Sequence, residues 1–252
     1  MSSPDKGQWK FWLFILFDVI ALVIIGALLF RTFFPKEPEV VELSYEQPML
    51  VEEPQMMEHI QELIAKGVAE QNKERFQHSV FLGDSLTEGL SIYGYVKTSN
   101  VVAQKGLSIE RAMKKVNTIA KKKPQYVFVM LGINDLNFAT YSMDDIEENY
   151  RKLVKKLHRK LPDAKIYVQS LLPVTNSFQK EHKRLSNKRI NALNKRLKNL
   201  SKDYKYTSYV DIHKLYVNKK GCLSSKISSD GYHLKMDAYQ NWVEYVKGEM
   251  KE

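Results

Sequence analysis

The chain has 252 residues and a formal net charge of +10 at pH 7. This length suits one catalytic-size domain with appended segments. Hydrophobic residues make up 44% of the chain and charged residues 27%, a composition that excludes an intrinsically disordered protein. Cys222 is the only cysteine, so an intramolecular disulfide and a cysteine-based metal site are both excluded.

The N-terminal region carries a long apolar segment. Residues 11–30 are apolar except for Asp18 and one glycine, and this is about the length that a helix needs to cross a hydrocarbon core of roughly 30 Å. Trp9 and Trp12 fall where the membrane interface would lie. No small-residue cleavage pattern follows, so we predict a retained transmembrane anchor in preference to a cleaved signal peptide or a buried core helix. Asp18 has no role that the sequence explains.

The regions on either side of this anchor carry matching numbers of basic residues, so charge alone does not fix its orientation. The tail of residues 1–10 is short and the chain beyond the anchor is long, which favours a single-pass protein of the cell membrane with an extracellular catalytic domain. Residues 31–55 are rich in proline and glutamate, as an extended linker is. Apolar spacing in residues 56–75 predicts an amphipathic helix that leads a catalytic domain of residues 56–252.

The rest of the chain alternates short apolar runs with longer amphipathic ones. The apolar runs predict strands over Ser79 to Leu82, Asn100 to Ala103, Tyr126 to Leu131, Lys165 to Ser170 and Thr207 to Asp211. The amphipathic runs predict helices over Ile109 to Lys122, Met143 to Lys160, Gln179 to Lys202 and Met236 to Lys247. This alternation indicates an α/β fold in which helices cover both faces of a parallel sheet. Catalytic groups of such folds gather at the carboxyl ends of the strands.

The first of these strands ends in Gly83-Asp84-Ser85-Leu86, and a helical stretch follows. A serine at this strand-to-helix turn has an exposed hydroxyl, and the helix N-terminus offers backbone donors to a developing oxyanion. Taken alone, the tetrapeptide fits a helix N-cap serine equally well.

Three further motifs favour catalysis. Gly106 follows the second strand, Asn134 follows the third within Gly132-Ile133-Asn134-Asp135, and Asp230 and His233 precede the last helix with a spacing of three. A glycine can present its N–H with no side chain in the way. Together these residues supply the nucleophile, base, orienting group and oxyanion donors that acyl transfer requires.

In these four blocks the sequence resembles the SGNH hydrolase superfamily, also called the GDSL esterases and lipases, over roughly residues 78 to 250. The resemblance implies a three-layer α/β/α, flavodoxin-like fold and an ester hydrolase with no metal or organic cofactor. It implies Ser85 as the nucleophile, His233 as base and then acid, and Asp230 as its partner. It also implies an oxyanion hole made by the Ser85 N–H, the Gly106 N–H and the Asn134 side-chain amide.

Other residues leave alternatives open. Asp211 and His213 are a rival orienter and base, and Asp135 is expected to brace its turn by hydrogen bonds. The remaining histidines are expected at surface or helix positions: His59, His78, His158 and His182. No helical metal-ligand spacing such as His-Glu-x-x-His occurs, so we predict no metal site.

The predicted substrate is an O-acetyl or other small ester on a cell-envelope glycan, because a basic domain held at a membrane would attract anionic polymers. One alternative function is that of a lysophospholipase or thioesterase, and another is that of a glycan O-acetyltransferase. A non-enzymatic polymer-binding domain is the weakest alternative. Apolar residues in loops after the third and fourth strands favour an acyl pocket: Phe138, Tyr141, Met143 and Phe178. We expect no nucleic-acid partner, because the basic residues are spread over several helices without a recognition motif.

Overall fold

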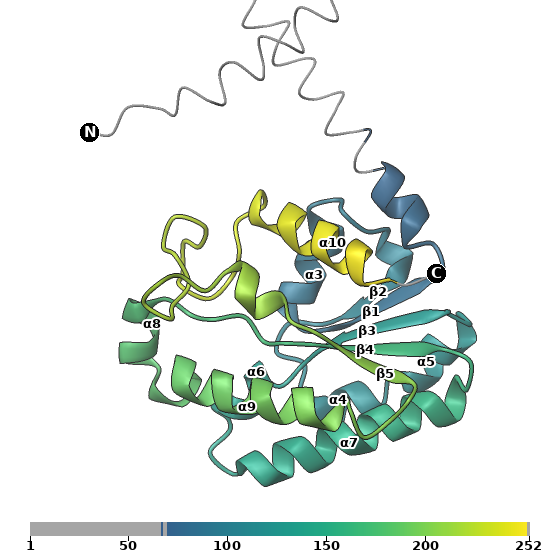
Figure 1. Cartoon of the computed structure of the whole chain (residues 1–252), viewed down its shortest axis with the longest axis horizontal. Helices are drawn as coiled ribbons and strands as arrows, with labels where there is room; N and C mark the ends of the chain where they lie inside the picture. The colour runs from purple at the N-terminus through teal and green to yellow at the C-terminus, as the bar shows by residue number, and fades with distance from the viewer. Residues whose placement is uncertain (1–66, 68–69, 251–252) are drawn as a thin grey trace, which may run out of the picture. The chain divides into compact units, whose positions relative to one another are not determined.

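The computed structural model describes residues 67 and 70–250 (Figure 1). The predicted tail, anchor and linker of residues 1–55, and most of the predicted leading helix, lie outside the described residues. Residues 70–75 are helical, in agreement with the end of that leading helix. Within the described part of the chain, no helix has both the length and the apolarity of a membrane span.

Five parallel strands form one sheet in the order β2-β1-β3-β4-β5. Their bounds are β1 Ser79–Gly83, β2 Val101–Ala103, β3 Tyr126–Met130, β4 Lys165–Gln169 and β5 Thr207–Val210. The sequence predicts all five to within one residue at both their starts and their ends. The strand order is that of flavodoxin-like sheets. The chain adds β2 on one side of β1 and then β3, β4 and β5 on the other, so the order of the strands reverses between β1 and β3. Folds of this kind bind their ligands at this point. The predicted α/β class and parallel sheet are therefore confirmed.

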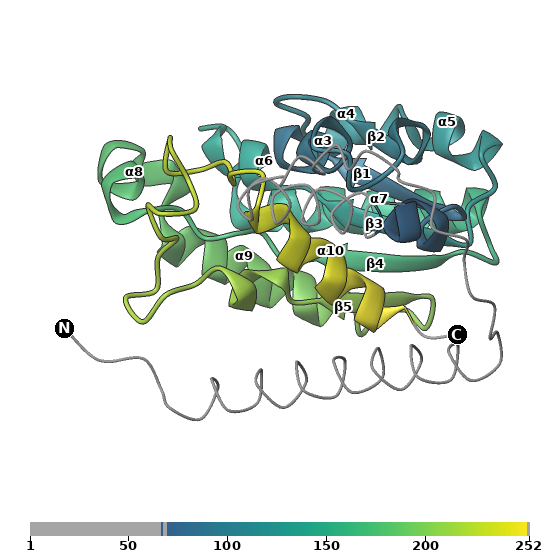
Figure 2. The same cartoon turned by 90° about the horizontal axis from the view of Figure 1, so that it is seen from above.

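Helices cover both faces of the sheet (Figures 1 and 2). On one face lie α3 (Ser85–Ile92) and α10 (Ala238–Glu249), and on the other α4 (Ile109–Met113), α5 (Val116–Lys121), α7 (Met143–Lys160) and α9 (Asn187–Leu200). Shorter elements are α6 (Ile133–Asn137), α8 (Asn176–Glu181) and the 3-10 turns η1 (Thr98–Asn100), η2 (Lys183–Leu185) and η3 (Ile212–Leu215). The fold is thus the predicted three-layer α/β/α arrangement.

The core includes an aromatic row that crosses three strands. The ring of Phe128 stacks on Phe81 of β1 with centroids 4.7 Å apart and on Tyr167 of β4 with centroids 4.8 Å apart. From α10, the buried Trp242 Nε1 donates a hydrogen bond of 2.7 Å to Gln169 Oε1 at the end of β4. This bond fixes α10 against the sheet and satisfies a polar group that burial would otherwise leave unpaired.

The helix predictions were accurate for α7 and less so elsewhere. Helix α7 has the predicted bounds and begins with a capping box of Ser142 and Asp145. The predicted helix 109–122 is divided into α4 and α5, because the N–H groups of Lys114 and Lys115 bond to carbonyls three residues earlier. The predicted helix 179–202 is divided into α8, η2 and α9, and the last predicted helix begins and ends two residues later than expected.

The division before α9 has a specific cause. Asn187, its first residue, accepts a hydrogen bond of 2.8 Å from the Val174 N–H and donates one of 2.9 Å to the Val174 carbonyl. The preceding Ser186 has the extended conformation φ −71°, ψ 148°. The pairing with Val174 fastens the chain to the loop after β4, and this tertiary contact overrides the local helical pattern.

Gly89 of α3 faces Tyr239 of α10, and a Cβ there would overlap the Tyr239 ring and hydroxyl. The Tyr239 hydroxyl donates a hydrogen bond of 3.0 Å to the Leu86 carbonyl. We expect Gly89→Ala to lower the free energy of unfolding by about 1–3 kcal/mol, as overpacking of a core does. Gly248→Ala is the control, since no atom lies within 4 Å of its added Cβ and alanine favours a helix. Equal Tm values for the two variants would contradict the expectation.

Candidate active site

Ser85 is the first residue of α3, and the side chain of Asp84 caps this helix by accepting a hydrogen bond from the Leu86 N–H. Ser85 Oγ lies 2.9 Å from His233 Nε2, and His233 Nδ1 lies 2.6 Å from Asp230 Oδ2. The structure thus brings the three predicted triad residues together in one continuous chain of contacts. Ser85 and His233 are 148 residues apart in the sequence.

The two oxygens of Asp230 have different tasks. Oδ1 accepts hydrogen bonds from the backbone N–H of Tyr232 at 2.9 Å and of His233 at 2.8 Å, while Oδ2 faces the imidazole. Burial alone would raise the pKa of Asp230, but the hydrogen bonds from His233 and Tyr232 outweigh it and hold this pKa at about 2. The carboxylate is therefore ionised at neutral pH. The three-residue spacing allows one side chain to shape the loop and orient the ring.

The loop that carries Asp230 and His233 is fastened to the segment after β4. Gly231 has φ +83°, and its carbonyl accepts a hydrogen bond of 2.9 Å from the Thr175 N–H. A Cβ at Gly231 would lie 2.5 Å from Thr175 Oγ1 and 2.9 Å from Phe178 Cβ. Both the positive φ and this close approach require glycine here.

The rival pair does not assemble in the same way. His213 Nδ1 faces the Leu171 carbonyl at 2.9 Å and Asn194 Nδ2 at 3.4 Å, so this ring braces the loop after β4. Within the described part of the chain, neither Asp211 nor His213 has a hydrogen bond to Ser85 or His233.

The predicted oxyanion donors lie at the carboxyl edge of the sheet. Gly106 has φ +70°, and nothing within 4 Å would meet a Cβ there, so the space beside its backbone is open. Across residues 70–250, the N–H groups of Ser85 and Gly106 donate to no protein acceptor. Asn134 differs, because its Nδ2 donates to Asp84 Oδ2 at 3.1 Å and to the Leu107 carbonyl at 3.3 Å.

Two buried carboxyl groups support this edge, and the sequence did not reveal their burial. Asp84 is 1% exposed and burial raises its pKa to about 7. Asp135 is fully buried, burial raises its pKa to about 6, and it accepts hydrogen bonds from the Ile109 N–H at the start of α4. Asp135 therefore braces the start of α4 by hydrogen bonds, whereas the sequence predicted that it would brace its own turn.

Aromatic residues near the triad are only partly those predicted. Phe178 stacks on Tyr232 with centroids 5.7 Å apart, and Tyr232 lies edge-on to His233 at 4.3 Å. Phe138 and Tyr141 instead contact each other at 5.9 Å, and the Tyr141 hydroxyl donates to Glu110. Tyr232 was missed because the Asp-x-x-His motif assigns no role to the residues between Asp230 and His233.

Comparison with known proteins decides the family. The model of the GDSL-like Lipase/Acylhydrolase family matches residues 81–240. The chain belongs to this family. The predicted resemblance is therefore confirmed at the level of the family, and no curated protein sequence matches the chain.

Solved structures agree with this assignment at the level of the fold. A GDSL-like lipase from Bacteroides thetaiotaomicron is 19% identical, with a TM-score of 0.58 and coverage of 68% of this chain and 86% of that one. A carbohydrate esterase family 3 protein from Talaromyces cellulolyticus is 16% identical, with a TM-score of 0.52 and coverage of 68% and 94%. A catalytic mutant of an acetylxylan esterase from Geobacillus stearothermophilus is 14% identical, with a TM-score of 0.51 and coverage of 68% and 92%.

Three further histidines in the described part of this GDSL-family domain have no hydrogen bond to the triad. His158 stacks on Tyr206 at 3.6 Å, His182 stacks on Phe178 at 4.2 Å, and His78 is exposed before β1. Cys222 is buried. Among the described residues, no group of three or more His, Cys, Asp and Glu side chains is arranged to hold a metal ion.

The contacts of Asp230 and Asp211 predict different effects of the same substitution. Asp230→Asn keeps the shape but disturbs the proton arrangement on His233, so we expect kcat to fall between about ten-fold and ten-thousand-fold. Asp211→Asn, the matched control, should leave kcat within about two-fold because Asp211 does not bond to the ring. Steady-state kinetics on folded protein measures both. A larger loss of kcat in the Asp211 variant would reverse the assignment of the orienting carboxylate.

The burial of Asp84 predicts a pH-dependent stability. An aspartate ionises near pH 4 in an unfolded chain, whereas Asp84 keeps its proton to about pH 7 in the fold. Its contribution to stability is therefore full below about pH 4 and is lost as the pH rises through about 7. The Tm of the wild type minus that of Asp84→Asn should be most positive near pH 4 and should shrink toward pH 7. The exposed Asp163→Asn is the control, and a constant difference for Asp84→Asn would contradict its raised pKa.

Proposed function

We propose that the chain is a serine ester hydrolase that acts through an acyl-enzyme. The observation that carries this proposal is the continuous set of contacts from Ser85 through His233 to Asp230, beside the open space at Gly106. A nucleophile, a base within hydrogen-bond reach and a carboxylate that orients the base are the parts that such chemistry requires.

In the proposed first half-reaction, His233 Nε2 takes the proton of Ser85 while Oγ attacks the ester carbonyl carbon. The resulting oxyanion accepts hydrogen bonds from the N–H groups of Ser85 and Gly106 and from the Asn134 amide. When the tetrahedral intermediate collapses, His233 returns the proton to the leaving alcohol oxygen. Water then attacks the acyl-enzyme with the same base, and Asp230 stabilises each imidazolium that forms.

Asn134 must change one contact to act in this way. Both of its amide hydrogens already have acceptors, Asp84 at 3.1 Å and the Leu107 carbonyl at 3.3 Å. The longer bond, to Leu107, is the one that we expect a bound oxyanion to replace, because the bond to Asp84 keeps the amide at the edge of the sheet. Catalytic hydrogen bonds commonly tighten only when substrate is bound.

The substrate that we propose is an O-acetyl or other small ester on a glycan of the cell envelope. The net charge of +10 favours attraction to anionic polymers. The Tyr232 ring lies against His233 and stacks on Phe178, and rings in this position favour a small acyl group. A carbohydrate esterase and an acetylxylan esterase have the same fold. The proposed location is the cell membrane, with residues 11–30 as the anchor and the hydrolase domain outside.

Hydrolysis of long acyl chains is a second candidate, because Phe138 is 48% exposed and could contact such a chain. Transfer of the acyl group to a sugar hydroxyl would use the same triad. Initial rates on nitrophenyl acetate and nitrophenyl palmitate distinguish an esterase for small acyl groups from one for long acyl chains. Acetylation of an added glycan acceptor would reveal acyl transfer to a sugar hydroxyl.

Replacing the nucleophile tests the mechanism directly. Ser85→Ala removes one hydroxyl and no core volume, so we expect kcat on nitrophenyl acetate to fall by at least about a thousand-fold with an unchanged Tm. Ser91→Ala on the same helix is the matched control, because the Ser91 hydroxyl donates only to the Glu88 carbonyl. Activity of Ser85→Ala above a thousandth of the wild-type value would refute the proposed nucleophile.

A further inference from the structure

A groove of about 940 Å³ runs along β5, the edge strand of the sheet. Its lining extends from the loop before β5 to η3 after it, and it includes one side of α10. Ser85, Asp230 and His233 are not among the lining residues. The groove is therefore separate from the catalytic edge at β1 and β3.

All the aromatic residues that line this groove are tyrosines. They come from β3, β4, β5, α10 and the loop before β5: Tyr126, Tyr167, Tyr209, Tyr245 and Tyr204. The centroids of Tyr126 and Tyr167 lie 6.1 Å apart, and since Tyr167 is buried against Phe128, it supports the more exposed ring of Tyr126. The electron-rich face of such a ring attracts the C–H groups of a sugar, and its hydroxyl can bond to sugar hydroxyls.

The lining of the groove carries an excess of positive charge. Four lysines, Lys165, Lys198, Lys202 and Lys214, occur with two acidic residues, Asp211 and Glu249. Lys214 lies 4.6 Å from the centroid of the Tyr245 ring, and the carboxylates of Asp211 and Glu249 act on this lysine. The lining thus has two more positive than negative side chains.

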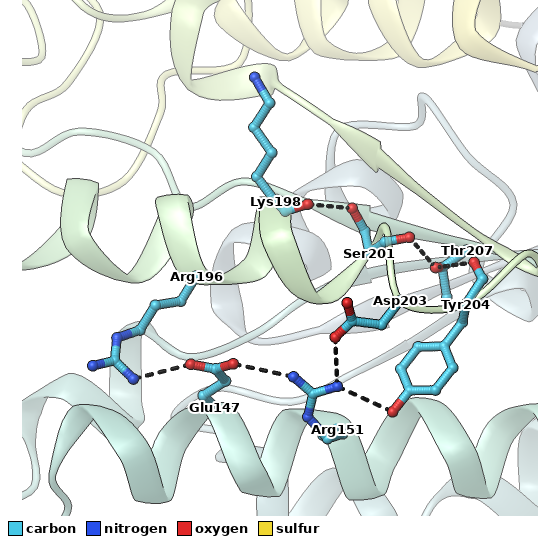
Figure 3. A network of polar contacts seen from close by, with 8 residues as sticks. All are labelled: Glu147, Arg151, Arg196, Lys198, Ser201, Asp203, Tyr204 and Thr207. Atoms are coloured by element: carbon cyan, nitrogen blue, oxygen red, sulfur yellow. Dashed lines mark hydrogen bonds and ion pairs between the residues drawn. The ribbon is translucent and has the colours of Figure 1, made fainter.

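The acidic side chains of a neighbouring network are largely paired with arginines (Figure 3). Arg151 contacts Glu147 and Asp203, and Arg196 contacts Glu147 and Asp144. Two guanidinium groups compensate two of the three carboxylates, so the network leaves one negative charge against the lysines of the groove. The side chain of Lys198 extends away from this network in Figure 3.

The wall that carries the lysines is held in place by hydrogen bonds. The Ser201 hydroxyl donates to the Lys198 carbonyl at 2.8 Å, and the Thr207 hydroxyl donates to the carbonyls of Ser201 and Tyr204 (Figure 3). Arg151 also donates to the Tyr204 hydroxyl at 3.2 Å. A fixed wall reduces the conformational entropy that a ligand must remove on binding.

We propose that this groove binds an anionic glycan chain, as a second site on the polymer whose ester is cleaved at Ser85. The proposal rests on the proposed function and names the class of its substrate, a polysaccharide with negative charge. Lysines match the charge of such a chain and the tyrosine rings match its sugar faces. A bilayer surface is too flat to enter a groove, whereas an extended chain can follow the edge strand.

Binding is tested on the full-length Ser85→Ala protein in detergent, so that no turnover occurs. The probe is a fluorescein-labelled polygalacturonate oligomer, and its fully methyl-esterified form serves as a neutral chain with the same backbone. Fluorescence anisotropy should show tighter binding of the anionic chain, with an affinity that falls as salt is added. Equal affinity for the two chains would overturn the charge assignment.

The site is located with two double variants of equal charge change. Lys198→Glu with Lys202→Glu should weaken binding at least ten-fold, whereas Lys114→Glu with Lys155→Glu, exposed positions outside the groove, should change it less than three-fold. Tyr245→Leu tests the rings and should weaken both the anionic and the neutral chain several-fold. Equal losses in the two charge variants would overturn the groove as the site.

The outcomes also separate this proposal from the proposed function. With Ser85 present, the Lys198/Lys202 variant should keep the wild-type rate on nitrophenyl acetate. Groove-specific binding without hydrolysis of any ester would support the groove and refute the hydrolase. Ester hydrolysis without groove-specific binding would refute the groove alone. Tighter groove-specific binding of poly(U) than of polygalacturonate would overturn the choice of a glycan.

Discussion

The close approach of β1 to β3 at their carboxyl ends places two of the proposed catalytic groups, Ser85 and Asn134. Gly83 pairs with Met130, and a Cβ at Gly83 would lie 2.8 Å from the Met130 carbonyl and would overlap Thr87. Only glycine permits this separation, and Ser85 follows Gly83 by two residues while Asn134 follows Met130 by four. Because the sheet order reverses between these strands, the chains after β1 and β3 turn to opposite faces and leave an opening between them.

Two aspartates near this opening show how environment decides the state of the same side chain. Asp230 receives hydrogen bonds from Ser228, Tyr232 and His233 and has its pKa lowered to about 2, so it can stabilise an imidazolium as a fixed negative charge. Asp84 is buried behind Asn134 with its pKa raised to about 7. An ionised Asp84 would hold the amide firmly but would oppose negative charge on a nearby oxyanion. A protonated Asp84 keeps the hydrogen bond to the amide and removes that repulsion, so burial would favour an oxyanion below about pH 7.

The sequence predicted the elements that depend on local patterns and the site that depends on motifs. Alternating apolar runs gave the five strands, and α7 was placed at its observed bounds because a serine cap and a proline after Leu161 mark its ends. The break before α9 was missed because Asn187 bonds to Val174, a contact visible only in three dimensions. The burial of Asp84 and the groove along β5 were missed for the same reason, since both are made by residues distant in the sequence. The anchor and linker stay predictions.

The separation between the groove and the triad sets what each can contribute. Across the sheet, β1 and β5 are three inter-strand steps apart, about 14 Å at a spacing of about 4.8 Å, and the length of the strands adds to this distance, which an extended glycan of several units spans. A polymer held along β5 would therefore present neighbouring units to Ser85 at a raised local concentration, and its apparent affinity would exceed that of either contact alone. A small ester reaches only the triad and gains nothing from the lysines. Substitutions in the groove should therefore change the KM for the polymer. They should not change kcat, because the chemical step depends on the contacts around His233.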